Sequence, residues 1–133
     1  DLKKRVLEQP KISEWNWIKV AEGTETFPLP SYIDKNSVKK EGKYKYYWSL
    51  SNYDVRSSDG IISTALYNRV DCKKIQSQLL RFKGYSEHWA KGELISDWET
   101  NEEERVWGTG HPKSSVKKVL KTVCKETYER KEK

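Results

Sequence analysis

The stretch Lys43-Tyr-Lys-Tyr-Tyr-Trp-Ser-Leu-Ser-Asn52 decides the fold of this chain. Its side chains alternate without a break, with Tyr44, Tyr46, Trp48 and Leu50 on one side and Lys45, Tyr47, Ser49 and Ser51 on the other. A period of two predicts a β-strand with one apolar and one polar face. Such strands are typical of an antiparallel sheet that packs one face on a core and exposes the other to water. We therefore expect Lys45 and Tyr47 to face solvent.

Extended segments flank this strand on both sides. Upstream, the composition predicts a strand at residues 15–20 and a short one at residues 32–34. Downstream, residues 61–83 predict one long extended segment that Gly84-Tyr85 ends, and residues 89–98 predict one or two short strands. The alternative for residues 75–82 is a helix, because Ile75, Leu79 and Phe82 are spaced by four and three. The missing N-cap favours the strand.

A helix is predicted close to the C-terminus. Ser114 or Ser115 can serve as its N-cap. One apolar stripe at helical spacing follows, made of Val116, Val119, Leu120, Val123 and Cys124. The fold class predicted from these elements is α+β, with a single antiparallel sheet of about five to six strands and one C-terminal helix packed on it.

Composition indicates a small core in need of reinforcement. The 133 residues carry a net charge of +6, and only 35% of them are hydrophobic. Leu, Ile, Val and Phe make up about a fifth of the chain, a fraction at which chains tend towards disorder. Six Trp, eight Tyr and two Phe compensate, because each aromatic side chain buries a large area. No apolar run is long enough to predict a membrane span.

Two cysteines, Cys72 and Cys124, offer that reinforcement. Cys124 lies on the apolar face of the predicted helix, and Cys72 lies within the long extended segment. A disulfide between them would close a loop of about 50 residues and stabilise the fold by about 4 kcal/mol. Two reduced thiols in a cytosolic protein are the alternative. The chain has no Met and begins at Asp1, which indicates either a removed signal peptide or an artificial boundary.

Several short motifs follow one another along the chain from residue 15 to residue 125. The first half of the pattern consists of Trp17, Tyr32-Ile33-Asp34, Ser37, Trp48, Asn52-Tyr53, Gly60 and Ser63. The second half consists of Val70-Asp71-Cys72, Trp107, Pro112, Ser114 or Ser115, Leu120 and Val123-Cys124. Each motif is short, and their order and spacing over residues 15–125 together resemble the surface-adhesin protein E family of bacteria.

The resemblance implies a curved antiparallel sheet, a helix tied to it by the disulfide, and a secreted, periplasmic or cell-surface location. It divides the chain into an N-terminal segment at 1–14 that could form a short helix, an adhesin E-like domain at 15–125 and a charged tail at 126–133. The function it implies is non-enzymatic binding of a protein or glycan at the envelope or in the extracellular matrix, and it suggests a homodimer. The alternative within the envelope is an accessory subunit of a larger assembly.

We expect no catalytic residues, no metal site and no cofactor. The chain contains no nucleophile elbow, no phosphate-binding loop and no zinc-protease motif. His88, His111 and the two cysteines have spacings that match no zinc site. Asp34 is better explained by an Asx turn with Ser37 than by a role as an acid.

Aromatic and basic side chains provide the candidate binding residues. Trp89, Trp98 and Trp107 lie in loop-rich stretches and are candidates for exposed ligand contacts. The alternative is that they are buried, because a core with few aliphatic residues needs aromatic side chains to fill it. A positive surface is predicted from Lys73, Lys74, Arg81 and Lys83. A nucleic-acid-binding protein is a further alternative, because Lys43, Tyr44, Lys45, Tyr46 and Tyr47 interleave charges with rings. Acidic residues mixed in along the chain argue against it.

Overall fold

An antiparallel sheet and one helix form the part of the chain that the structure describes. The computed structural model describes residues 15–25, 28–108 and 115–125. Its strands are β1 (Trp17–Ala21), β2 (Ser31–Asp34), β3 (Lys39–Glu41), β4 (Tyr44–Asn52), β5 (Ser63–Asp71), β6 (Gln76–Glu87) and β7 (Lys91–Glu99). Two 3₁₀ turns, η2 (Lys35–Ser37) and η3 (Glu102–Glu104), and the helix α2 (Ser115–Val123) complete these elements.

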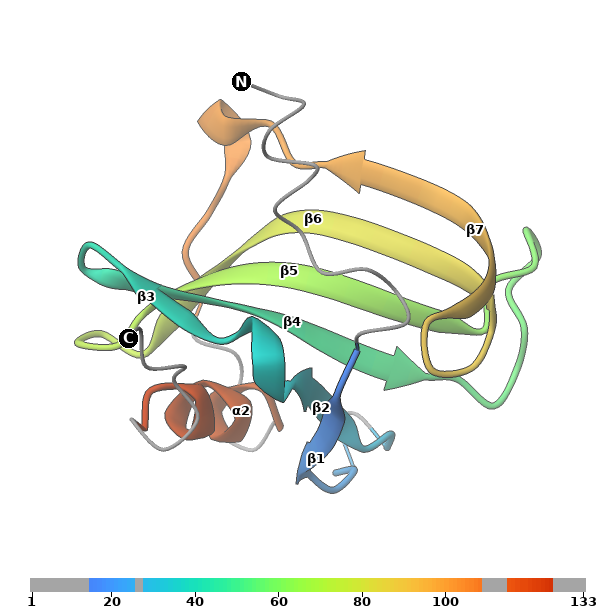
Figure 1. Cartoon of the computed structure of the whole chain (residues 1–133), viewed down its shortest axis with the longest axis horizontal. Coiled ribbons are helices and arrows are strands. Elements are labelled where there is room, and N and C mark those ends of the chain that lie inside the picture. Colours follow the sequence, from blue (N-terminus) through green and yellow to red (C-terminus); the bar gives the residue numbers. More distant parts are fainter. Residues whose placement is uncertain (1–14, 26–27, 109–114, 126–133) are drawn as a thin grey trace.

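The strands pair antiparallel throughout, in the order β1-β2-β4-β5-β6-β7. β3 also pairs with β4, so that β2 and β3 share one edge of β4. Figure 1 shows the curved sheet with α2 against one face, close to β1 and β2. The predicted fold class is confirmed, with seven strands instead of five to six. The predicted helix within residues 1–14 and the tail at 126–133 lie outside the described residues.

The segment predicted at 61–83 consists of two strands and not of one. The chain turns at residues 72–75, between β5 and β6. The Asp71 Oδ1 atom accepts the backbone N–H groups of Lys73 at 3.0 Å and Lys74 at 3.3 Å, which replaces the sheet bonds with an Asx-type turn. Ile75 completes the turn with a positive φ of 52°. Cys72 therefore lies in a hairpin turn, and the alternative of a helix here is wrong.

Gly84 does not end a strand, because β6 continues through it to Glu87. The absent side chain makes room for Ile61: a Cβ atom at Gly84 would lie 2.5 Å from the Ile61 Cδ1 atom. The hairpin that follows places Trp89 and Ala90 at positive φ, 67° and 56°. The segment at residues 89–98, predicted to form one or two short strands, contains a single strand, β7.

Both faces of the sheet are covered over β4 and β5, which corrects the expectation of one solvated face. On one face, α2 packs Val119, Leu120 and Val123 against the sheet in a mostly aliphatic cluster with Tyr47 and Val70. The exposed fraction of Tyr47 is 4% and that of Lys45 is 7%, so neither faces water. The alternation could not show this, because it reports which residues share a face and not what covers that face.

The opposite face carries an aromatic cluster. Trp48, Leu50, Ala65, Tyr85 and Ala90 are buried in it. Trp15, Trp17, Tyr32 and Tyr67 pack against this cluster from partly buried positions. Aromatic side chains thus replace the missing aliphatic ones, as the composition predicted.

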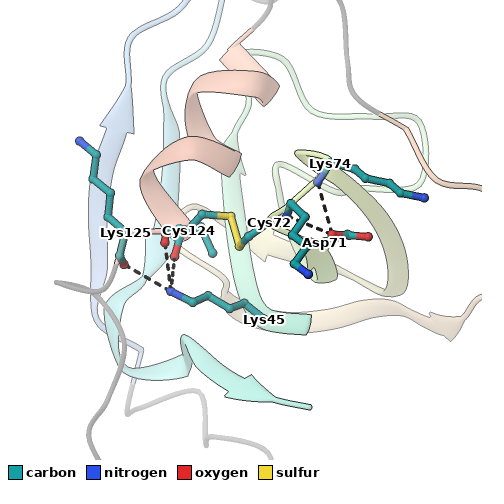
Figure 2. Close-up of a disulfide and its surroundings, with 8 residues drawn as sticks. Lys45, Asp71, Cys72, Lys74, Cys124 and Lys125 are labelled. Atoms are coloured by element: carbon teal, nitrogen blue, oxygen red, sulfur yellow. Dashed lines mark hydrogen bonds between the residues drawn. A yellow bond between two sulfur atoms is a disulfide. The ribbon is translucent and has the colours of Figure 1, made fainter. Parts of the chain in front are cut away.

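The predicted disulfide between Cys72 and Cys124 is confirmed, and the alternative of two free thiols is wrong. It joins the β5–β6 turn to the end of α2, as Figure 2 shows. Beside it, the Lys45 Nζ atom donates to the carbonyl oxygens of Val123 and Cys124, both at 3.3 Å, and of Lys125 at 3.5 Å. A buried lysine therefore satisfies carbonyls that the helix end leaves open.

The junction between β2 and β4 rests on the predicted Asx turn. Asp34 accepts the backbone N–H of Asn36 at 3.1 Å and that of Asn16 at 3.0 Å. The Ser37 hydroxyl donates to the Asp34 carbonyl at 2.8 Å and accepts from the Trp48 N–H at 2.9 Å. These bonds connect β1, η2 and β4, so this motif has a structural role.

Candidate functional site

Two hairpin ends meet at one end of the sheet. The β3–β4 turn contains Gly42, at a positive φ of 64°, and Lys43. The β5–β6 turn carries Lys73 and Lys74. Because Lys45 pairs with Val70, the antiparallel register brings both turns to the same end of the sheet, on the left in Figure 1.

A pocket of about 290 Å³ lies between these turns. We call it the basic pocket; it is lined by Lys43, Tyr44, Asp71, Lys73, Lys74, Gln76 and Trp107. Three lysines face one aspartate, and two aromatic rings complete the lining. The pocket thus combines positive charge with aromatic surface.

Trp107 reaches the pocket through a backbone bridge to β6. Gly108 and Ser77 exchange two N–H···O bonds, both of 2.9 Å. The Trp107 ring lies 5.3 Å from the Tyr44 ring, between centroids. The Arg69 guanidinium lies 5.2 Å from the Tyr44 centroid and 5.6 Å from that of Trp107. Its Nε and a terminal nitrogen both donate to the Gln78 side-chain oxygen, which fixes the guanidinium beside the two rings.

The lysines of the basic pocket have no carboxylate partner within the described residues. The two ion pairs among the described residues, Lys19–Glu22 and Arg81–Asp97, lie outside the basic pocket. Asp71 directs one oxygen at the backbone of its own turn, and Figure 2 shows the Lys74 side chain pointing away from the disulfide. The arrangement can therefore attract an anionic group next to aromatic rings.

The other two predicted basic residues lie elsewhere. Arg81 and Lys83 are on β6, at least five residues beyond Gln76, which corresponds to roughly 17 Å along the strand. Arg81 donates to both oxygens of Asp97, at 2.8 and 2.9 Å, and this pair lowers the pKa of the Asp97 carboxyl. Lys83 Nζ lies over the Trp48 ring at 5.3 Å, and burial lowers its pKa.

The remaining predicted tryptophans are exposed but separate from the basic pocket and from each other. Trp98 on β7 is 46% exposed and stacks on Phe82 with 5.0 Å between ring centroids. Trp89 is 40% exposed at the β6–β7 turn, where its backbone N–H donates to Asn52. Of the seven predicted binding residues, the structure brings Lys73, Lys74 and Trp107 together.

The described residues include no group of three or more His, Cys, Asp or Glu side chains that could hold a metal ion. The His88 ring contacts the Tyr53 carbonyl oxygen through its Nε2 atom, at 2.8 Å. No helix in the described part of the chain is long and apolar enough to cross a membrane.

Comparison with known proteins agrees with the family expected from the motifs. A family model described as surface-adhesin protein E matches residues 17–125, which is most of the chain. The chain belongs to the surface-adhesin protein E family. It is thus an envelope-associated, adhesin-like binding module. A search of curated protein sequences gave no match.

Solved structures of protein E from Haemophilus influenzae share the fold of this family member. One has a TM-score of 0.61 at 14% sequence identity, covering 81% of this chain and 83% of that one. The structure of protein E from non-typeable Haemophilus influenzae has a TM-score of 0.57 at 16% identity, covering 84% and 85%. At these identities the likeness shows a common fold.

Sequence reasoning missed part of the basic pocket of this adhesin E-family chain. Lys43 and Tyr44 were considered only for stacking on nucleic acid, and Asp71 and Gln76 were not singled out as site residues. The available signal was the Asp71-Cys-Lys-Lys74 turn, in which an Asx turn exposes two adjacent lysines. The register that places Lys43 and Tyr44 opposite this turn is set by long-range pairing, which one sequence does not reveal.

Proposed function

We propose that this adhesin E-family chain is a non-enzymatic module, secreted or exposed at the bacterial cell surface, that binds an acidic protein or glycan outside the cell through the basic pocket. One observation carries the proposal: Lys73, Lys74 and Trp107 line a single pocket in which no lysine has a carboxylate partner among the described residues. Lysines without carboxylate partners attract an acidic ligand from a distance, and the indole supplies contact area.

The rigid surroundings of the pocket support the same proposal. The disulfide holds the turn that carries Lys73 and Lys74, and the bridge between Gly108 and Ser77 holds Trp107. A site that is ordered before binding loses little conformational entropy when the ligand arrives. Positive charge on such a site accelerates association and makes it dependent on salt.

A binding panel tests the function. The chain is passed over immobilised matrix proteins, acidic and neutral glycans, and nucleic acid, at about 50 and about 300 mM salt, since screening grows over this range. We expect retention by acidic matrix proteins or glycans that weakens with salt. Retention by nucleic acid alone would contradict the proposal and favour a nucleic-acid-binding protein.

The location is tested separately, on intact cells of the source bacterium. Antibodies against the chain, or a protease added outside, should reach a protein at the cell surface, and secreted chain should be found in the medium. Signal only after the cells are broken open would contradict this part of the proposal.

A further inference from the structure

The chemistry of the basic pocket identifies a class of ligand. We propose that this pocket binds an acidic sugar residue of a glycan chain, through aromatic contact with the sugar ring and lysine contact with its carboxylate or sulfate. The inference rests on the function proposed above and adds to it the ligand class and the site.

The aromatic rings supply a surface for the sugar ring. Tyr44 and Trp107 lie 5.3 Å apart between centroids, with their planes tilted by 41°. Aromatic faces are electron-rich, so they attract the weakly positive C–H groups that cover one side of a sugar ring. A nucleobase could also stack on one of these rings, so the comparison with an oligonucleotide belongs to the test below.

The charges match an acidic group attached to that ring. Lys73 and Lys74 belong to one turn, and Lys43 belongs to the other, with its Nζ atom 5.4 Å from the centroid of the Tyr44 ring. Lysine is a mobile point charge, so it tolerates the varied orientation of a carboxylate or sulfate on a sugar better than a rigid guanidinium does. The nearby Arg69 is engaged with Gln78.

The remaining polar groups fit the hydroxyls of a sugar. Asp71 contributes a carboxylate, which accepts hydrogen bonds, and Gln76 contributes an amide, which both accepts and donates. Asp71 repels the acidic group of any ligand, and a sugar can offset this repulsion by donating its hydroxyl hydrogens to the carboxylate. A ligand with hydroxyls next to its acidic group uses both kinds of side chain.

The volume of the pocket sets the scale of the ligand. At about 290 Å³ it lies at the small end of ligand sites, which measure about 300–1,000 Å³. This is room for one bulky group and not for a helix or a folded partner. We therefore expect one sugar residue to enter while the rest of the glycan chain lies along the sheet end.

Calorimetric titration of the whole chain tests the ligand class. The probes are a heparin hexasaccharide, a hyaluronan hexasaccharide, a neutral chitin hexasaccharide, a polyglutamate peptide and an oligothymidylate. We expect at least one acidic saccharide to bind about tenfold more tightly than the neutral one, the peptide and the oligonucleotide. Tighter binding of polyglutamate or oligothymidylate than of both acidic saccharides would overturn the inference.

Paired variants test the site. Lys73→Gln/Lys74→Gln should weaken binding of the acidic saccharide about tenfold, and Trp107→Ala should weaken it about fivefold or more. The control Lys118→Gln/Lys121→Gln removes the same charge from exposed positions on α2, and Trp98→Ala removes an exposed indole from β7. Both controls should keep the affinity within about twofold.

The double lysine variant changes two exposed turn side chains, so it remains informative if Trp107→Ala fails to fold. Equal affinities of the pocket and control variants would overturn the inference while leaving the proposed function intact. If the chain retains neither acidic glycans nor acidic matrix proteins, the proposed function itself fails.

Discussion

Removing the disulfide should cost this small fold a large share of its stability. The perturbation is the double variant Cys72→Ala/Cys124→Ala. The disulfide closes a loop between residues separated by 52 positions, and the loss of that constraint on the unfolded chain corresponds to about 4 kcal/mol. Domains of this size are stable by only about 5–15 kcal/mol, so the effect is a substantial fraction of the total.

The packing of the helix indicates that the variant still folds. Val119, Leu120 and Val123 remain buried against the sheet, and Lys45 still donates to the carbonyls at the helix end. Both cysteines are only half-buried, so replacing sulfur with hydrogen leaves a small gap. The loss should therefore come mainly from the unfolded state and not from contacts within the native structure.

Urea unfolding followed by tryptophan fluorescence measures the effect. We expect a shift of about 4 kcal/mol in the free energy of unfolding. Reduced wild-type chain is the matched control, and it should lose the same amount, whereas a reductant should leave the variant unchanged. A loss below about 1 kcal/mol would refute the reasoning, since it would show that the unfolded chain gains little freedom when the bond is removed.

Three further predictions concern the core. Lys45→Met should lower the free energy of unfolding by about 1–3 kcal/mol, because it leaves carbonyls at the helix end without a donor; urea unfolding measures it. Gly84→Ala should cost about 1–3 kcal/mol through overpacking, whereas Gly108→Ala, whose Cβ would meet nothing within 4 Å, should be close to neutral in the same assay. Burial raises the pKa of Tyr67 to about 12 and that of Tyr85 to about 12, above the unfolded value. Their contribution to stability is therefore full below pH 10 and is lost as the pH rises through 12. The difference in tyrosinate absorbance between the wild-type chain and the variants Tyr67→Phe and Tyr85→Phe measures this during alkaline titration, and a difference that appears near pH 10 would contradict it.

The elements with a local signal were predictable from the sequence. The alternation in residues 43–52 identified β4, and the helical spacing around Leu120 identified α2. The partnership of Cys72 and Cys124 followed from the need to reinforce a core poor in aliphatic residues, since two cysteines allow only one pairing. These features depend on neighbouring residues or on a simple count, so one sequence suffices to find them.

The features that depend on long-range pairing were not predictable. β3 has three exposed residues and no apolar pattern, and it forms a strand only because β4 offers it an edge. Lys45 appeared to belong to a wet face, because nothing in its own strand indicates that α2 covers it. The basic pocket has the same origin, since its lysines come from turns that only the register of β4 and β5 brings together.

The residues that carry the family resemblance and those that form the basic pocket are largely different sets. Asp34 and Ser37 hold strands together, Asn52 fixes the β6–β7 turn, and Cys72 ties the helix to the sheet. The lysines of the pocket support none of these contacts. Because they lie at the ends of hairpins, they can change without disturbing the fold, and a relative with the same sheet can present other side chains at this place. The proposed binding site therefore rests on the chemistry of this chain's own side chains and not on the fold that it shares with its relatives.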